Sequence, residues 1–155
     1  MKLIVTTTAI LLTAGAVFAQ DAQPSLADLG SDSAMKAAYD AMTKGHEMPE
    51  WLTGNAVTSP GDEVSFGGKS YVAMSACKPH DCSAQAVAVL YDPQEKTMYG
   101  VLSSQEEDGT REALQWLNIG GGPESIDGKT LLYATLTGSV SNHPNDFKYI
   151  AEASE

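Results

Sequence analysis

The chain has 155 residues, enough for one domain with a hydrophobic core, and its 43% hydrophobic content argues against a disordered protein. Its net charge of −11 excludes an electrostatic preference for nucleic acid or an anionic membrane surface. The same charge favours a basic protein partner, although acidity alone also serves solubility.

Residues 1–19 have the pattern of a secretory signal peptide. Lys2 precedes a mostly apolar stretch, and Val17 and Ala19 place small side chains where signal peptidase cleaves. The stretch is too short for a membrane anchor, and Asp21 follows it instead of a positively charged flank. We therefore expect cleavage after Ala19, export from the cytoplasm, and a single domain over residues 20–155 with a net charge of −12.

The first part of this domain is predicted to be helical. Residues 26–29 suggest a short turn, and residues 33–44 suggest a helix that Asp32 or Ser33 caps. One face of this helix is apolar at helical spacing and is expected to face the core; its members are Met35, Ala38, Tyr39 and Met42. Trp51, in the connector that follows, is expected to bury against a sheet.

The middle of the chain predicts consecutive β-hairpins. Strand-like segments at residues 64–66, 71–76, 84–91 and 97–102 are separated by turn-forming sequences such as Gly67-Gly68 and residues 92–96. Such short connections are typical of an antiparallel meander.

In the last third, Thr110 is expected to cap a short helix over residues 111–117, with Leu114 and Leu117 facing inward. A turn at residues 126–129 is expected to lead into a final strand over residues 130–136. Residues 137–145 are expected to form an irregular tail. The predicted fold is α+β: a single domain whose central antiparallel sheet of about five strands is flanked by short helices, with an ordered core over roughly residues 26–149.

Both cysteines lie in one six-residue stretch, residues 77–82, between two strand-like segments. In an exported protein such a pair most often forms a disulfide, which would clamp the tip of a hairpin and project His80 from a rigid loop. One alternative is a metal site that uses Cys77, Cys82 and His80, and a related one is a small metal-binding or hydrolytic protein that uses His80 and Asp81 with His46 or His143. A catalytic dithiol is a second alternative, although it usually has the spacing Cys-x-x-Cys.

No arrangement of residues predicts an enzyme. His80 next to Asp81 could serve as a base with its orienting group, but no nucleophile lies in the same stretch. The Gly120-Gly121-Gly122 segment lacks the strand and helix that flank a phosphate-binding loop. We therefore expect no catalytic activity, no cofactor and no metal.

The Cys77-Lys78-Pro79-His80-Asp81-Cys82 sequence, in an exported acidic chain of this length, resembles the inhibitor of vertebrate lysozyme (Ivy) family of Gram-negative periplasms. The resemblance extends over about residues 26–149. Supporting segments are Met74-Ser75-Ala76, Trp116-Leu117-Asn118, Ser125-Ile126-Asp127-Gly128-Lys129-Thr130, Leu136-Thr137-Gly138-Ser139 and Asn142-His143-Pro144. The leader and the Gly120-Gly121-Gly122 break depart from the family pattern.

The resemblance implies a C-type lysozyme as the partner, and such lysozymes are generally basic. It implies that His80 enters the lysozyme cleft and hydrogen-bonds the catalytic carboxylates, while Asp81 helps to fix the loop contacts. It further implies a disulfide clamp from Cys77 and Cys82, with contact and shape from Lys78 and Pro79. Two alternatives stay open: the same loop could regulate the cell's own lytic transglycosylases, and the chain could be a monomer or a homodimer.

Overall fold

A computed structural model describes residues 23–106, 108–121 and 124–147. Three short helical elements come first: η1 (Leu26–Gly30), α1 (Ser33–Met42) and α2 (Trp51–Gly54). Six strands follow: β1 (Val57–Thr58), β2 (Asp62–Phe66), β3 (Lys69–Cys77), β4 (Gln85–Asp92), β5 (Thr97–Gln105) and β6 (Glu112–Leu117). Two helices end the described chain: α3 (Glu124–Leu136) and α4 (Ser139–Asn142). The predicted signal peptide at residues 1–19 lies outside the described residues.

The six strands form one antiparallel sheet in the order β1-β3-β4-β5-β6, with β2 also paired to β3. β1 and β2 occupy different stretches of β3, because Val57 lies opposite Cys77 whereas Asp62 lies opposite Ala73. From β2 to β6, each strand pairs with the next one along the chain. The predicted α+β fold with a central antiparallel sheet is therefore confirmed, with six strands where about five were expected.

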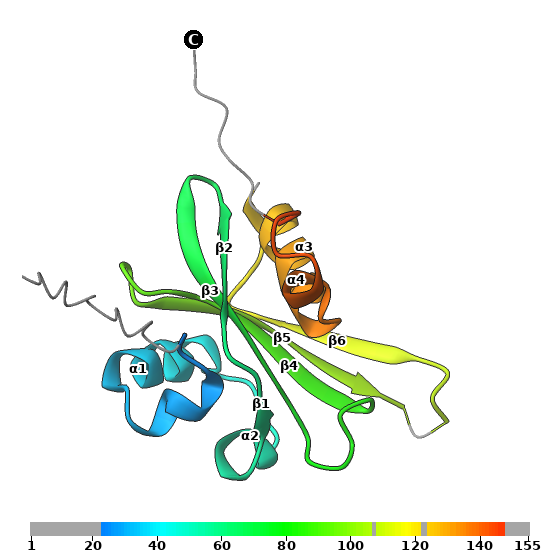
Figure 1. The fold of residues 1–155 in the computed structure, drawn as a ribbon. Coiled ribbons are helices and arrows are strands. Elements are labelled where there is room, and N and C mark those ends of the chain that lie inside the picture. The colour runs from blue at the N-terminus through cyan, green and yellow to red at the C-terminus, as the bar shows by residue number, and fades with distance from the viewer. Residues whose placement is uncertain (1–22, 107, 122–123, 148–155) are drawn as a thin grey trace, which may run out of the picture.

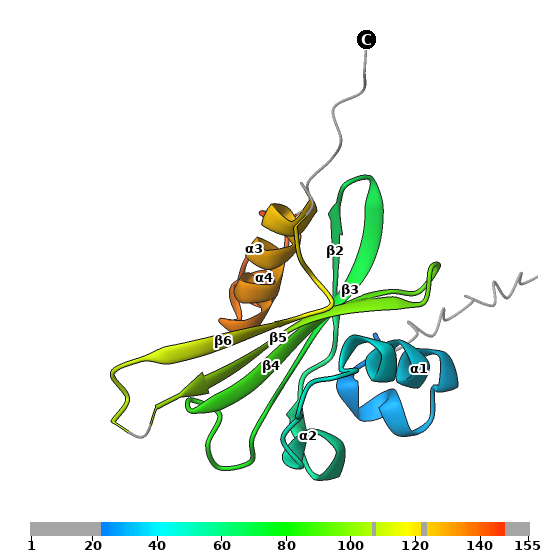
Figure 2. The same cartoon turned by 180° about the vertical axis from the view of Figure 1, so that it is seen from behind.

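Helices cover both faces of the sheet (Figures 1 and 2). η1, α1 and α2 pack on one face, and α3 and α4 pack on the other. Alternate residues of β4 serve the two cores: Val87, Val89 and Tyr91 face the first, while Ala88 and Leu90 face the second. A strand covered on both faces explains why residues 86–91 are continuously apolar rather than alternating.

Helix α1 forms as the sequence predicts. The Asp32 carboxylate caps it by accepting hydrogen bonds from the backbone N–H groups of Ala34 and Met35, at 2.9 and 3.0 Å. The four stripe residues, Met35, Ala38, Tyr39 and Met42, are all buried. Helix α1 approaches the sheet closely at Gly100, where a β-carbon would lie 2.8 Å from the Met42 sulfur.

The prediction of a helix over residues 111–117 is wrong, because Glu112–Leu117 form β6. This strand pairs with β5 so that Glu112 lies opposite Gln105 and Leu117 opposite Gly100. Leu114 and Leu117 have helical spacing, but they belong to different cores on opposite faces of the sheet. The neighbouring strand β5 supplies the hydrogen-bond partners, and local sequence spacing cannot reveal that neighbour.

The predicted final strand over residues 130–136 is also wrong, because these residues are the second half of α3. The expected turn at residues 126–129 lies inside the same helix, and part of the expected irregular tail forms the single turn α4. Leu131, Leu132 and Ala134 are buried, whereas Tyr133 is 41% exposed. A nearly continuous apolar run fits a helix or a strand, and packing against the sheet decided for the helix.

Candidate functional site

The six-residue stretch that holds both cysteines forms the connection between β3 and β4. Cys77 is the last residue of β3, and it pairs with Ala86 near the start of β4. The Lys78 N–H donates to the Gln85 carbonyl at 3.0 Å and closes the neck of the loop. Cys77 and Cys82 are joined by a disulfide with their α-carbons 4.8 Å apart, as the sequence predicted. A clamp on so small a ring removes freedom that the loop would otherwise lose on binding.

Inside the clamp, the backbone of the loop is fixed by its own hydrogen bonds. The Asp81 N–H donates to the Lys78 carbonyl at 3.0 Å. The Asp81 carbonyl accepts from the N–H groups of Ala84 and Gln85, at 3.1 and 3.2 Å. The Lys78 ammonium also pairs with the Asp81 carboxylate at 3.1 Å, but both side chains are about 40% exposed, so this ion pair adds little stability. The loop is therefore held in shape mainly by the backbone groups of Lys78 and Asp81.

His80 lies at the tip of the loop and is exposed. Its backbone has a φ of +63°, in the left-handed region that non-glycine residues adopt infrequently. The hydrogen bonds and the disulfide on either side hold it there. Within the described part of the chain, no hydrogen bond or ion pair engages the His80 ring. The ring nitrogens are thus available to a partner, one as a donor and one as an acceptor when the imidazole is neutral.

A side chain from a distant helix braces the neck of the loop. The Trp51 indole N–H, at the start of α2, donates to the Gln85 side-chain oxygen at 2.8 Å. Gln85 therefore contributes three groups: its N–H to the Asp81 carbonyl, its carbonyl to the Lys78 N–H, and its side chain to Trp51. The next residue of α2, Leu52, is buried in the core and anchors this brace.

A second turn lies at the same end of the sheet, because β5 and β6 are joined next to the β3–β4 loop (Figures 1 and 2). The Gln105 N–H donates to the Ala84 carbonyl at 2.8 Å and ties the two connections together. In the second turn, Glu106 pairs with Arg111 at 2.8 Å, and Asp108 accepts from the Thr110 N–H and hydroxyl. The two bonds from Thr110 lower the pKa of Asp108, so that carboxylate carries its charge over a wider pH range.

The other two histidines, His46 and His143, contact residues outside the loop. The His46 Nδ1 lies 2.9 Å from the Gln115 side-chain nitrogen, on β6. The His143 Nδ1 lies 3.9 Å from the Asp146 carboxylate, after α4. Among the described residues, no three His, Cys, Asp or Glu side chains are grouped as a metal would require. The metal alternative needs free thiolates, whereas the structure joins the two sulfurs in a disulfide.

The sequence identified the loop but missed the residues that brace it. Trp51 was expected to bury against a sheet, and it is half-buried, but its specific partner was not foreseen. Trp51 and Gln85 are 34 residues apart, and a glutamine that begins a strand gives no signal of its own. Separately, no helix within the described ranges has the length and apolar content needed to cross a membrane.

A family model and individual relatives identify the same protein family. The family model described as "Inhibitor of vertebrate lysozyme (Ivy)" matches residues 34–136, which include the loop and its supporting strands. The protein named "Inhibitor of vertebrate lysozyme" from Escherichia coli (strain K12) is 40% identical over 145 residues, covering 94% of this chain and 91% of that protein. The protein of the same name from Pseudomonas aeruginosa is 32% identical over 88 residues, covering 56% of this chain and 58% of the relative.

Proposed function

This chain belongs to the inhibitor of vertebrate lysozyme family, and we propose that it is a periplasmic protein that inhibits a C-type lysozyme by inserting the Cys77–Cys82 loop into the active-site cleft. The observation that supports the insertion is the loop itself: a disulfide-clamped hairpin tip with an exposed histidine whose ring no described side chain engages. Membership of an inhibitor family agrees with a chain that is not an enzyme.

The proposed contact follows from the chemistry of the target. Lysozyme cleaves glycosidic bonds with two carboxyl groups on either side of the bond, one acting as an acid and one ionised. An imidazole between these groups can donate a hydrogen bond to the ionised carboxylate and accept one from the protonated acid. His80 at the tip of a narrow, rigid loop has the donor and the acceptor that this requires. Inhibition then needs no covalent step, because the loop fills the cleft and occupies both catalytic groups.

Rigidity is what makes the loop suitable as a plug. A flexible loop would lose conformational freedom on entering a cleft, and that loss would oppose binding. The disulfide, the Lys78–Gln85 neck and the Trp51 brace fix the loop before the partner arrives. We therefore assign Cys77 and Cys82 the role of clamp and His80 the role of key inhibitory residue. Lys78 and Pro79 shape the loop and contact the enzyme, and Asp81 helps to fix the contacts that the loop makes.

Charge supports a basic partner. The net charge of −11, or −12 without residues 1–19, attracts a basic enzyme and speeds the encounter. The second turn lies at the same end of the sheet as the loop. Glu106 in this turn is paired with Arg111, whereas the Asp108 carboxylate adds negative charge where the partner would approach. The disulfide fits an oxidising compartment such as the periplasm, in agreement with the predicted cleavage after Ala19.

The decisive experiment measures hydrolysis of Gram-positive cell walls by a C-type lysozyme while the protein is titrated in. We expect inhibition to be complete near one inhibitor per enzyme. A parallel titration against a lytic transglycosylase compares the two cell-wall enzyme classes. Stronger inhibition of the transglycosylase would move the target of the loop to that class, and failure to inhibit lysozyme at all would refute the proposal.

A further inference from the structure

The disulfide loop is too small to form a protein interface by itself. It has six residues, whereas a specific interface buries roughly 800 Å² of each partner and uses about 20–30 residues on each side. An enzyme that receives the loop in its cleft must therefore also contact the surface at the base of the loop. On one side of this base lies the second turn, with Asp108. The other side is formed by β1, which pairs with the last residues of β3 (Figure 1).

The register of the strands places three apolar side chains next to one another on the β1 side. Val57 of β1 lies opposite Cys77 of β3, and Cys77 lies opposite Ala86 of β4. Residues directly opposite each other point to the same face of a sheet, so these three side chains are neighbours. We call Val57, Cys77 and Ala86 the apolar row. Val57 is 52% exposed, and Cys77 and Ala86 are half-buried.

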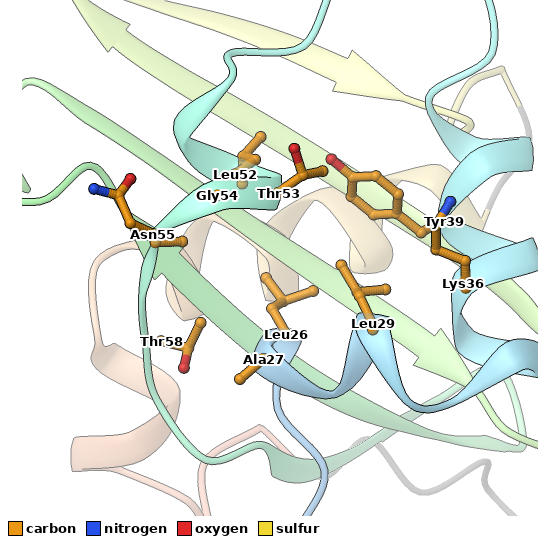
Figure 3. A pocket seen from close by; sticks show the side chains of 12 residues that line it. Leu26, Ala27, Leu29, Lys36, Tyr39, Leu52, Thr53, Gly54, Asn55 and Thr58 are labelled. Atoms are coloured by element: carbon orange, nitrogen blue, oxygen red, sulfur yellow. The ribbon is translucent and has the colours of Figure 1, made fainter.

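The apolar row lies on the face of the sheet that α3 covers elsewhere. The next residue of β1, Thr58, belongs to the opposite face, where Figure 3 shows it beside Leu26 and Ala27 of η1. Ala88, on β4 two residues beyond the row, points to the same face as the row and is fully buried in the core that α3 forms with the sheet. The helix thus covers the middle of this face and leaves the row at the base of the loop open to solvent.

An apolar row in this position is unusual for a sheet face that no helix covers. Such a face ordinarily carries polar side chains, because it is in contact with water. Within the described ranges three large hydrophobic side chains are exposed, and the other two, Ile126 and Tyr133, belong to α3. Val57 is therefore the one that lies next to the loop. Covering the row with a partner protein would remove its apolar surface from water, which is favourable.

We propose that the apolar row is a second contact with the lysozyme that receives the loop, and that Val57 packs against apolar side chains at the rim of the substrate cleft. This inference rests on the proposed function, because insertion of the loop is what brings the enzyme over the row. Ligand-binding clefts are lined mainly by apolar and aromatic side chains, so the rim offers a surface that suits a valine. His80 then supplies the polar contact inside the cleft, and the row supplies apolar burial beside it.

The test replaces Val57 by threonine, which keeps the size and the β-branched shape that suit a strand but exchanges a methyl group for a hydroxyl. Binding to a C-type lysozyme is measured by surface plasmon resonance. We expect Kd to rise about three- to tenfold, the effect of losing roughly half of a buried valine side chain. The change should lie in the dissociation rate, because an uncharged contact does not alter long-range attraction. His80→Ala, measured in parallel, reports the contact of the loop itself.

Ile126→Thr is the matched control, because Ile126 is another exposed β-branched residue, at 71% exposure in the first turn of α3. This turn lies near Phe66, which ends β2 at the end of the sheet away from the loop. The control should bind lysozyme within about twofold of the unchanged protein, as for a surface substitution outside an interface.

Methyl NMR with a soluble paramagnetic agent separates direct contact from an indirect effect through Cys77. The agent should broaden the Val57 methyl signals in the free protein, where this side chain is 52% exposed, and should broaden them much less in the complex. The Ile126 methyl signals should be broadened equally in both states.

Two results would overturn this contact while leaving the proposed function in place. One is a Val57→Thr variant that binds lysozyme as the unchanged protein does, although His80→Ala binds more weakly. The other is a set of Val57 methyl signals that the agent broadens as strongly in the complex as in the free protein. A protein that fails to bind lysozyme at all would instead refute the proposed function, and this inference with it.

Discussion

The indole N–H of Trp51 donates to the side-chain oxygen of Gln85 at 2.8 Å, and this bond joins a one-turn helix to the neck of the disulfide loop. Gln85 also accepts the Lys78 N–H through its backbone carbonyl. The loop is thus held from outside by α2 as well as from inside by its disulfide.

Replacing Trp51 by Phe should weaken lysozyme inhibition, because an aromatic ring stays at this position while the hydrogen bond to Gln85 is lost. The half-buried Gln85 oxygen would then lack its donor, at a cost of about 0.5–1.5 kcal/mol in the free energy of unfolding. Urea unfolding and the inhibition constant measure the two effects. Trp116→Phe is the control, since Trp116 lies under Lys129 near α3 and makes no bond to the loop. Equal inhibition by both variants would exclude a role for the brace.

Replacing His80 should abolish most of the inhibition without unfolding the domain. His80→Ala removes the imidazole, and we expect binding to weaken by about 1–4 kcal/mol, as for a central interface residue. His80→Asn is the stricter variant, because asparagine tolerates the left-handed backbone that His80 adopts. His143→Ala, at another exposed histidine, should inhibit normally. An unchanged inhibition constant in His80→Asn and His80→Ala would remove His80 from the mechanism.

Removing the disulfide should weaken lysozyme inhibition while the domain stays folded. The double variant Cys77→Ser with Cys82→Ser loses the disulfide. Because the closed ring is small, the chain-entropy model predicts a loss of only about 2 kcal/mol in the free energy of unfolding. The domain should remain folded, as near-ultraviolet circular dichroism can verify, while the affinity for lysozyme falls because the loop must now be ordered on binding. Inhibition that is indifferent to the double substitution and to reductant would make the disulfide a stabiliser only.

Salt should slow complex formation. The chain carries a net charge of −11, and screening shortens the range over which it attracts a basic enzyme. Stopped-flow association rates should therefore fall steeply between low and high salt, while the dissociation rate changes little. Glu106→Gln with Asp108→Asn should lower the rate at low salt more than Lys36→Gln with Asp40→Asn, which leaves the net charge unchanged. A flat response of the association rate to salt would rule out steering by charge.

Stability should fall at alkaline pH through three tyrosines. Burial is the main cause that raises the pKa values of Tyr39, Tyr71 and Tyr91 above 10.0. The unfolded chain therefore loses these protons at lower pH than the folded chain, so the free energy of unfolding decreases as pH rises past about 10. Urea unfolding from pH 8 to 11 measures this decrease. Tyr91→Phe or Tyr71→Phe should flatten it, and an equally steep decrease in both variants would contradict this cause.

The sequence by itself determined the parts whose signals are local. The cap and apolar stripe of α1, the turns between β2 and β5, and the Cys77–Cys82 loop with His80 were all predictable, because each depends on residues close together in the chain. The motif in the loop also pointed to the family. These features need no knowledge of what packs against them.

Tertiary structure decided what local spacing leaves ambiguous. Residues 112–117 became a strand because β5 offers an edge to pair with, and residues 130–136 became helical because the β-sheet presents a second apolar face to cover. The Trp51–Gln85 brace and the apolar row beside the loop likewise arise only when distant segments meet. The physical reason is that burial and hydrogen-bond partners far along the chain outweigh the small differences in local propensity.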